Sequence, residues 1–359
     1  ARRARVVTIS VLAVAALGLT ACTGGGNGAT GGDVNTVDDS LAASFDDAIA
    51  NAMTSSGSTE AIVGIWGSDG SEYVRAYGND ELDGGSLIRG GQATQPVMCA
   101  LLLDLVEEGT IDLDREISKD LTRQVGIEGI TYRQLCDMRS GLADFKSGFR
   151  DIFVNNPTRV WPEQELIAQG LVHSPLKWPG LDFHESDTNA TMLSRVLRVK
   201  TASETAQLLD DHVFNKASMG STFYPDPTTT ALSGSTLSGL AYASKGGKPV
   251  CKTGALEVPE VSSSMLAGAG GTVTTVTDLK NFYSSYLDGE FGGDAASVVT
   301  EKTPTKNPKR NKDGEPKTDP VTTGRQWTFG METQGPLYGR AGAITGTLTA
   351  AYHDPETEY

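Results

Sequence analysis

The segment GGQATQPVMCALLLDLVEEG, residues 90–109, is the feature that most constrains the fold of this chain. On a helix its apolar residues would cover nearly every side, which predicts a helix buried in the core of a sizeable domain. Pro96 stands near the first turn, where proline costs little, and Gly109 is placed to end the helix. Yet two long neutral amides, Gln92 and Gln95, stand at its start and head for the interior.

Length and charge exclude several classes of protein. With 359 residues the chain can form one large domain, and its formal net charge of −15 argues against nucleic-acid binding, which needs a basic surface. Only four histidines are present, and no Cys and His spacing is typical of zinc. We therefore expect no nucleic-acid partner, no metal and no cofactor.

The first residues predict export. Three arginines precede an apolar run from residue 6 to 19, which is too short to span a bilayer and is typical of a signal peptide. The run ends in LTAC, which resembles the lipobox of bacterial lipoproteins. This resemblance implies cleavage after residue 21 and a thioether from Cys22 to a diacylglycerol with palmitate-type acyl chains. An ordinary signal peptide with a coincidental cysteine is the alternative.

The resulting organisation has three parts. Residues 1–21 would be the signal peptide, and residues 22–40, rich in Gly and polar residues, would be a lipidated flexible tether. Residues 41–359 would form the folded domain. We expect the protein to be held by the lipid on Cys22 at the extracytoplasmic face of the cell membrane.

Two of the other cysteines are candidates for a disulfide. Cys99 lies on the buried helix, and Cys136 lies in ITYRQLCDMRSGL, where Thr131 and Gln134 are spaced as a helix capping box. In an exported protein these cysteines could pair, but the sequence does not fix the geometry they would need. Small apolar core residues are the alternative interpretation.

The remaining patterns predict an α+β fold. Strands are expected at both chain ends, with a helical middle, which suggests a terminal antiparallel sheet flanked by helices and an inserted all-helical lobe. A charged, proline-bearing stretch is expected to be an exposed loop. The expected elements are strands 62–66 and 72–77, a helix over 162–171, two helical segments in 189–214, a helix capped by Thr275 and Asp278, the loop 301–320, and strands in 326–333, 335–342 and 346–354.

Five segments carry a family resemblance, in the same order along the chain. ITYRQLCDMRSGLADF is similar to ITIRHLLTHTSGL, WPGLDFHESDTNATML to PPGTRFSYSNTNYxLL, AGAGGTVTTVTDLKNF to AAGGLxSTAxDLAxF, and YGRAGAITGTL to YGHGGxxPGF. LLLDLVEEGTIDLDREI is similar to the stretch after the nucleophile helix. From about residue 42 onward the chain thus resembles serine β-lactamases and penicillin-binding proteins. The nearest branch contains class C β-lactamases, D-alanyl-D-alanine carboxypeptidases and esterases, which implies a β-lactamase/transpeptidase-like fold.

That family uses three motifs around one pocket. Serine and lysine form S-x-x-K on the first turn of a buried helix, a Y-x-N turn assists proton transfer and substrate binding, and a K-T-G or H-x-G strand helps to form the oxyanion hole. The serine attacks a carbonyl to give an acyl-enzyme, and it is a poor nucleophile without a nearby base.

All three motifs are altered in this chain. By register, Gln92 stands at the serine and Gln95 at the lysine of S-x-x-K, and a carboxamide is neither a nucleophile nor a general base. Glu185 and Asp187 stand where the family has Tyr and Asn. The resemblance therefore implies that no catalytic residue of these two motifs is intact.

The third motif keeps only one residue. Arg340 replaces the first residue of H-x-G, and Gly342 is retained. Arg340 could pair with Asp187 or Glu185 and close the pocket, or it could hold the carboxylate of a cell-wall peptide. The leading hypothesis is a pseudoenzyme that binds a peptidoglycan stem peptide or a partner protein such as a cell-wall enzyme.

Two alternatives remain: an active serine hydrolase with a displaced nucleophile, and a structural surface lipoprotein. Four segments match parts of the motifs by letter, and chance coincidence is the preferred interpretation of each. They are Ser86 with Arg89, Ser174 with Lys177, Lys252-Thr253-Gly254, and Tyr77-Gly78-Asn79. In the family a further strand and a C-terminal helix follow the last segment seen here, so we expect the domain to be incomplete at its C-terminal end.

Overall fold

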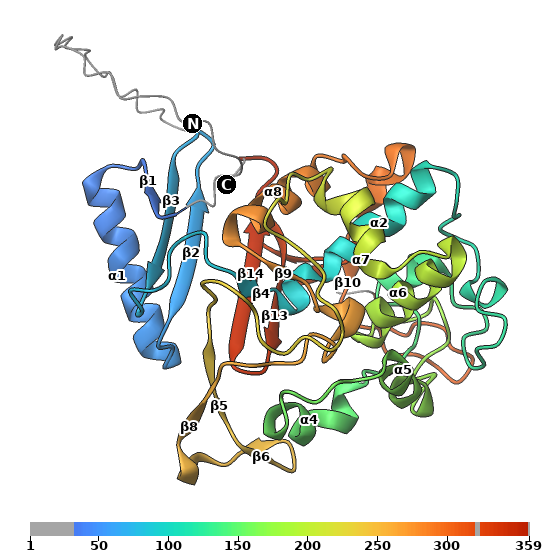
Figure 1. Cartoon of the computed structure of the whole chain (residues 1–359). Helices are drawn as coiled ribbons and strands as arrows, with labels where there is room; N and C mark the ends of the chain where they lie inside the picture. The colour runs from blue at the N-terminus through green and yellow to red at the C-terminus, as the bar shows by residue number, and fades with distance from the viewer. Residues whose placement is uncertain (1–31, 320–323, 358–359) are drawn as a thin grey trace.

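The main strands lie between the N-terminal helix and most of the other helices (Figure 1). A computed structural model describes residues 32–319 and 324–357. The helices are α1 (Asp39–Ser56), α2 (Gln95–Glu107), α3 (Tyr132–Cys136), α4 (Lys146–Asn155), α5 (Glu163–Val172), α6 (Thr188–Thr201), α7 (Thr205–Leu209) and α8 (Val276–Leu287). Shorter helical turns are η1 (Gly91–Thr94), η2 (Ile117–Lys119), η3 (Asp210–Phe214), η4 (Cys251–Thr253), η5 (Ala267–Ala269) and η6 (Gly293–Thr300).

The strands form two main antiparallel sheets, of order β1-β3-β2 and β10-β11-β12-β13-β14. Smaller pairs are β4-β9, β5-β8 and β6-β7. The bounds are β1 (Val34–Asn35), β2 (Ala61–Trp66), β3 (Glu72–Tyr77), β4 (Ile88–Arg89), β5 (Gly239–Tyr242), β6 (Ser244–Lys245), β7 (Lys248–Pro249), β8 (Ala255–Val258), β9 (Val273–Thr274), β10 (Thr303–Pro304), β11 (Gln326–Trp327), β12 (Glu332–Gln334), β13 (Leu337–Ile344) and β14 (Thr347–His353).

The expected α+β class is confirmed, with one difference in the sheet. The strands from the two chain ends form two hydrogen-bonded sheets instead of one, and β2 and β14 are the terminal strands of these sheets. A cavity of about 850 Å³ is lined by residues of both strands and of α8. The predicted all-helical insertion is wrong, because the pairs β4-β9, β5-β8 and β6-β7 lie between the N-terminal and C-terminal strands. β2 and β14 do not pair with each other.

Helix α2 is buried, as its sequence predicts. The side chains of Val97 and Leu101 are fully buried, and this helix contributes most of its residues to the main hydrophobic cluster. Pro96 lies in the first turn, and Gly109 follows the helix with a φ of 74°. The α-helix itself begins at Gln95, because residues 91–94 form the tighter turn η1.

A disulfide joins α2 to α3. Cys99 and Cys136 are bonded, with their Cα atoms 5.9 Å apart, and both residues are buried. Helix α3 starts with the expected capping box between Thr131 and Gln134. Cys251 is a free, exposed cysteine.

The start of α8 differs from its prediction. The Thr275 hydroxyl accepts a hydrogen bond from the Asp278 N–H, as in a capping box. The Asp278 carboxylate instead accepts bonds from the Ser221 N–H and the Thr222 hydroxyl, because this neighbouring segment brings two donors to it. Only half of the predicted box is therefore formed.

The charged segment 301–320 is more than an exposed loop. Its backbone contributes β10 to the C-terminal sheet. Asn307 exchanges two hydrogen bonds with the backbone of Phe183, and the Arg310 guanidinium lies 2.7 Å from the Asp182 carboxylate. Because Asp182 is buried, its negative charge needs a counter-ion, and Arg310 of this loop supplies it.

Regular structure begins before residue 41. Val34 pairs with Val74 of β3, and the Asp38 carboxylate caps α1 by accepting the Leu41 N–H. The signal peptide 1–21 and the lipidation site Cys22 lie outside the described residues. Within the described chain, no helix has the length and apolar character needed to span a membrane.

Candidate functional site

Gln92 lies where η1 meets strand β13. The side chain of Gln92 is buried, as is that of Gln95 on the next turn. A Cβ atom added at Gly342 would lie 2.2 Å from the backbone nitrogen of Gln92, a distance that atoms cannot adopt. Glycine at 342 therefore lets β13 approach the helix start, and this approach brings the N–H of Ala343 to the Gln92 side chain.

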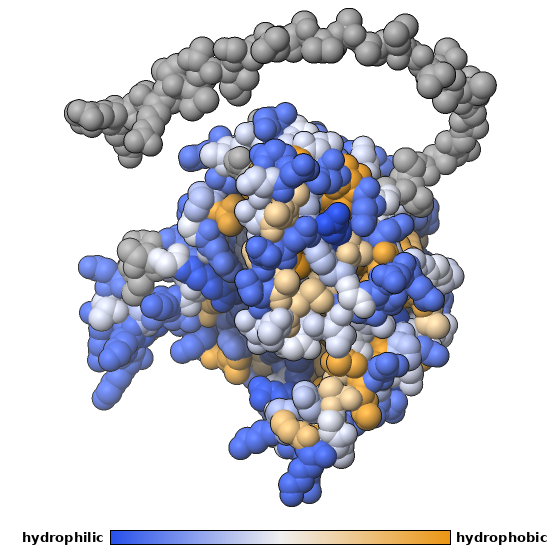
Figure 2. All heavy atoms as spheres, turned by 90° about the vertical axis from the view of Figure 1, so that its left-hand side faces the viewer, coloured by the Kyte–Doolittle hydropathy of each residue, from blue (hydrophilic) through white to orange (hydrophobic). Residues whose placement is uncertain are grey.

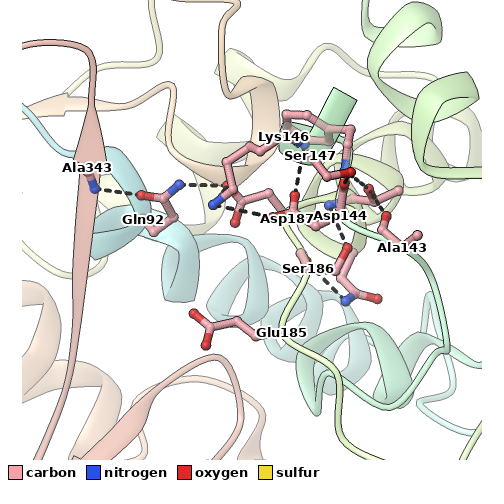
Figure 3. A network of polar contacts seen from close by, with 12 residues as sticks. Gln92, Ala143, Asp144, Lys146, Ser147, Glu185, Ser186, Asp187 and Ala343 are labelled. Atoms are coloured by element: carbon pink, nitrogen blue, oxygen red, sulfur yellow. Dashed lines mark hydrogen bonds and ion pairs between the residues drawn. The ribbon is translucent and has the colours of Figure 1, made fainter. Parts of the chain in front are cut away.

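The Gln92 carboxamide is bonded on both ends. Its Oε1 accepts a hydrogen bond of 2.7 Å from the Ala343 N–H, and its Nε2 donates one of 2.6 Å to Oδ2 of Asp187. Figure 3 shows this side chain reaching toward β13 on one side and toward Asp187 on the other. An amide offers one acceptor end and one donor end, so a donor on one side and a carboxylate on the other fix its orientation.

The Asp187 carboxylate contacts donor groups from η1, α2 and α4. Its carboxylate is almost fully buried and accepts from Gln92, from Gln95 Nε2 at 3.4 Å, and from the Lys146 ammonium at 2.8 Å. Lys146 is the first residue of α4 and also lies 3.7 Å from Asp144. The buried negative charge is therefore paired and hydrogen-bonded.

The neighbouring charges keep Lys146 protonated. Burial by itself lowers the pKa of the Lys146 ammonium, but Asp187 and Asp144 outweigh this effect and raise the pKa above its ordinary value. Burial, together with the charge of Asp187, raises the pKa of the Asp144 carboxyl. A lysine with a raised pKa is a counter-ion and a poor general base.

Arg340 and Glu185 form a separate ion pair. The Arg340 guanidinium lies 2.7 Å from the Glu185 carboxylate and is only 4% exposed. Its other side lies over the Trp327 ring, 4.7 Å from the ring centre. Arg325 makes a second contact with Glu185, at 2.8 Å.

The two guanidiniums control the charge of Glu185. Burial raises the pKa of the Glu185 carboxyl, but the charges of Arg340 and Arg325 outweigh burial and lower this pKa to about 2. Of the two partners predicted for Arg340, Glu185 forms the ion pair in the structure. Asp187 instead pairs with Lys146, and Glu185 stands apart from that network in Figure 3.

The structure therefore brings the predicted residues together as two internally paired groups, in which Gln95 Oε1 and Arg340 Nε are buried without a hydrogen-bond partner among the described residues. Gln92, Gln95 and Asp187 converge, and Gly342 lies against the backbone of Gln92. A backbone N–H on the third-motif strand could polarise a substrate carbonyl, but here the Ala343 N–H binds the Gln92 oxygen. Among these groups there is no hydroxyl or thiol next to a base.

The four segments that match parts of the family motifs in sequence alone make other contacts. The Ser174 hydroxyl donates to the Gly170 carbonyl in a segment that is not helical, the Tyr77 hydroxyl bonds Asp46, and the Arg89 guanidinium donates to the Thr230 carbonyl. Lys252 lies in the exposed turn η4. None of these contacts includes Gln92 or Asp187.

Sequence reasoning missed Lys146, Arg325 and Trp327. Lys146 follows the SGLADF segment directly, so its position next to the best-matched motif was the available signal. Trp327 lies in β11 and Arg325 lies just before it. Their contacts with Arg340 and Glu185 depend on the sheet order β11-β12-β13, in which β12 separates β11 from the strand of Arg340. No local pattern indicates such contacts.

Three side chains on α2, its C-terminal end and η3 have the spacing of a metal site. Asp104, Glu108 and His212 bring ligand atoms within 4.8 Å of one another. The Lys216 ammonium already lies 2.7 Å from the Asp104 carboxylate, and His212 Nδ1 lies 2.8 Å from it. This ion-pair network satisfies Asp104 without a metal ion.

Comparisons with known proteins agree with this architecture. The Beta-lactamase family model matches residues 45–359. D-amino acid amidase from Ochrobactrum anthropi is 21% identical with a TM-score of 0.72, covering 89% of this chain and 88% of that one. D-stereospecific amidohydrolase from a Streptomyces species is 20% identical with a TM-score of 0.70, covering 84% and 87%.

A third similar structure is a penicillin-binding protein homologue from Pyrococcus abyssi. It is 17% identical with a TM-score of 0.68, and the alignment covers 90% of this chain and 72% of that one. At these low sequence identities, the similar structures support the fold alone. The family model spans most of the sequence, and the chain therefore belongs to the beta-lactamase family of serine hydrolases and penicillin-binding-protein relatives.

Proposed function

We propose that this domain is a non-hydrolysing member of the beta-lactamase family that acts by binding a partner protein. One observation carries the proposal: the Gln92 carboxamide stands at the nucleophile position and bridges the Ala343 N–H and Asp187. The substitution removes the attacking oxygen. It also occupies the N–H that would otherwise face a substrate carbonyl.

The state of Arg340 favours partner binding over a peptide receptor in the cleft. A receptor for a peptide carboxylate needs an available cation, whereas the Arg340 guanidinium is buried, bonded to Glu185 and stacked on Trp327. Lys146 is likewise held by Asp187 and Asp144. Recognition would then use the outer surface of the domain.

We further propose that the domain is held outside the cytoplasm by a lipid on Cys22. The N-terminal sequence pattern is the support, and the bond between Cys99 and Cys136 suits an oxidising compartment. Metabolic labelling with a palmitate analogue tests this placement. We expect label on the wild type and none on a Cys22→Ser variant, and equal labelling of both would contradict the anchor.

Covalent probes test the loss of catalysis. The domain would be incubated with a fluorescent penicillin and with a fluorophosphonate, and its intact mass measured, beside a family member with an intact S-x-x-K motif as positive control. We expect no adduct on this domain, because a carboxamide cannot form the acyl-enzyme. A stoichiometric adduct on any serine would refute the proposal.

The structural neighbours suggest a second candidate, hydrolysis of D-amino acid amides, since one is named a D-amino acid amidase and another a D-stereospecific amidohydrolase. Incubation with D-phenylalanine amide and an assay for released ammonia tests it. We expect no release above that of heat-inactivated protein. Release that persists in a Gln92→Ala variant would point to a nucleophile elsewhere in the chain.

A further inference from the structure

One surface segment is basic, although the chain as a whole is acidic. We call residues 302–317 the basic segment. Residues 302–312 read KTPTKNPKRNK, which contains five cations and no acid, whereas the whole chain carries a formal net charge of −15. Lys317 follows after Asp313 and Glu315. All the lysines of the segment are exposed: Lys302, Lys306, Lys309, Lys312 and Lys317. Such a local positive field on an acidic protein attracts anions to this place.

Neighbouring elements hold the backbone of the basic segment in place. Thr303–Pro304 form β10, which pairs with β11. The Asn307 side chain exchanges hydrogen bonds of 2.7 and 2.8 Å with the backbone of Phe183. The Arg310 guanidinium lies 2.7 Å from the buried Asp182 carboxylate. The lysines therefore project from an ordered backbone, which lowers the entropy that a ligand loses in binding them.

Two lysines stand opposite each other where the basic segment turns back on itself. Arg310 and Pro316 form an antiparallel bridge, and the Lys317 N–H donates a hydrogen bond to the Lys309 carbonyl. Successive side chains of an extended strand alternate between its two faces, and Arg310 reaches Asp182. Lys309 and Lys317 therefore share the other face, and neither has an ion pair among the described residues. Like charges directly opposite each other repel, and a bound anion relieves this repulsion.

The side chains of the basic segment suit phosphate groups better than a protein surface. Lysine binds phosphate as a point charge, whereas it is depleted in protein–protein interfaces. Figure 2 shows a face of the molecule on which hydrophobic patches lie among hydrophilic residues. In contrast, the basic segment contributes none of the exposed large hydrophobic residues of the described chain. It also contains no aromatic residue on which a nucleic-acid base could stack.

The distribution of charge favours a flexible polymer over a membrane. An anionic bilayer is flat, so it would face acidic parts of the domain together with the basic segment, and like charges repel. A flexible chain can contact the basic segment alone. The lysines are also spread along the whole segment, so a single small anion would reach only a few of them.

From these observations we infer that the basic segment binds a flexible polymer that carries phosphate groups along its chain. Lys309 and Lys317 hold one phosphate between them, and Lys306 and Lys312 contact neighbouring phosphates of the same polymer. This site is separate from the altered cleft and does not depend on the proposed protein partner. Because its contacts are exposed ion pairs, the affinity falls steeply with salt concentration.

Binding of fluorescently labelled inorganic polyphosphate to the full chain tests the inference, with anisotropy measured at several salt concentrations. We expect the double variant Lys309→Gln, Lys317→Gln to raise the dissociation constant about tenfold or more and to reduce the salt slope, since each lost lysine releases about one counterion fewer. The matched control is Lys245→Gln, Lys248→Gln. These two lysines are also exposed and opposite each other, but the Asp151 carboxylate binds the turn between them. The control should change the dissociation constant by less than about twofold.

Two competitors test the class of ligand. Oligodeoxythymidine with the same number of phosphates should bind more weakly than polyphosphate, and phosphatidylglycerol vesicles at equal phosphate concentration should not displace polyphosphate. Tighter binding of the oligonucleotide would assign the segment to nucleic acid, and displacement by vesicles would assign it to a membrane surface. Either result would overturn the inference, as would a wild type that does not bind polyphosphate at low salt or an equal loss of affinity in both lysine-pair variants. Circular dichroism confirms that each variant is folded.

Discussion

The altered cleft and the β5–β8 arm, residues 239–258, differ in whether their charged groups are paired. In the cleft the buried charges of Asp187 and Arg340 each have an ionic partner within the domain. In the arm, Lys252 and the large side chain of Leu256 face outward. The positions that serve catalysis in the family thus make contacts within the domain, whereas the arm exposes a charged and an apolar side chain.

This difference has an energetic basis. Removing one partner of a buried ion pair costs about 3–5 kcal/mol, because the other charge remains buried, whereas an exposed charge or side chain contributes little. Substitutions in the cleft should therefore lower the free energy of unfolding, and those at exposed positions of the arm should change it little.

The largest effect is expected at Gly342. In a Gly342→Ala variant the new methyl group would meet the backbone of Gln92 and Ala93, which cannot move aside as a flexible side chain would. We expect a loss of about 3 kcal/mol or more in the free energy of unfolding, measured by urea denaturation. Gly220→Ala is the control, since a Cβ there meets nothing within 4 Å, and it should change stability by less than about 0.5 kcal/mol. Equal stability of both variants would contradict the close packing of β13 on η1.

The sequence predicted the cleft only in part. The register of the motifs identified Gln92, Gln95, Glu185 and Asp187, because each follows a local pattern that survives the substitutions. The pairing of Lys146 with Asp187 bridges 41 positions along the chain, and no periodicity encodes such a contact.

The fold shows the same limit. Burial of α2 follows from its composition, which leaves it no polar side. The separation of β2 from β14 depends instead on which strand edges meet, and edge pairing is a property of the whole fold.

A smaller and pH-dependent effect is expected at Glu185. Its pKa is lowered to about 2 in the folded protein, below the ordinary value of 4.5. The ionised carboxylate therefore stabilises the fold fully above about pH 5, and this contribution is lost as the pH falls toward 2. Because Glu185 is 37% exposed, we expect Glu185→Gln to cost at most about 3 kcal/mol at pH 7.

Denaturation at several pH values checks this sign. The difference in unfolding free energy between wild type and Glu185→Gln should shrink between pH 5 and pH 2. The raised pKa of Asp144 acts in the opposite direction, but it is common to both proteins and leaves the difference unchanged. A difference that stays constant with pH would mean that Glu185 acts through packing and not through its charge.

The smallest effect on stability is expected in the arm. Leu256→Ser removes an exposed side chain, so the free energy of unfolding should change by less than about 0.5 kcal/mol. The matched substitution Leu102→Ser, at a fully buried position of α2, should cost several kcal/mol. If Leu256→Ser destabilised the protein by a similar amount, Leu256 would belong to the core of the domain, and the contrast between arm and cleft would fail. If the stability of the domain is unchanged, the exposed arm does not belong to its core.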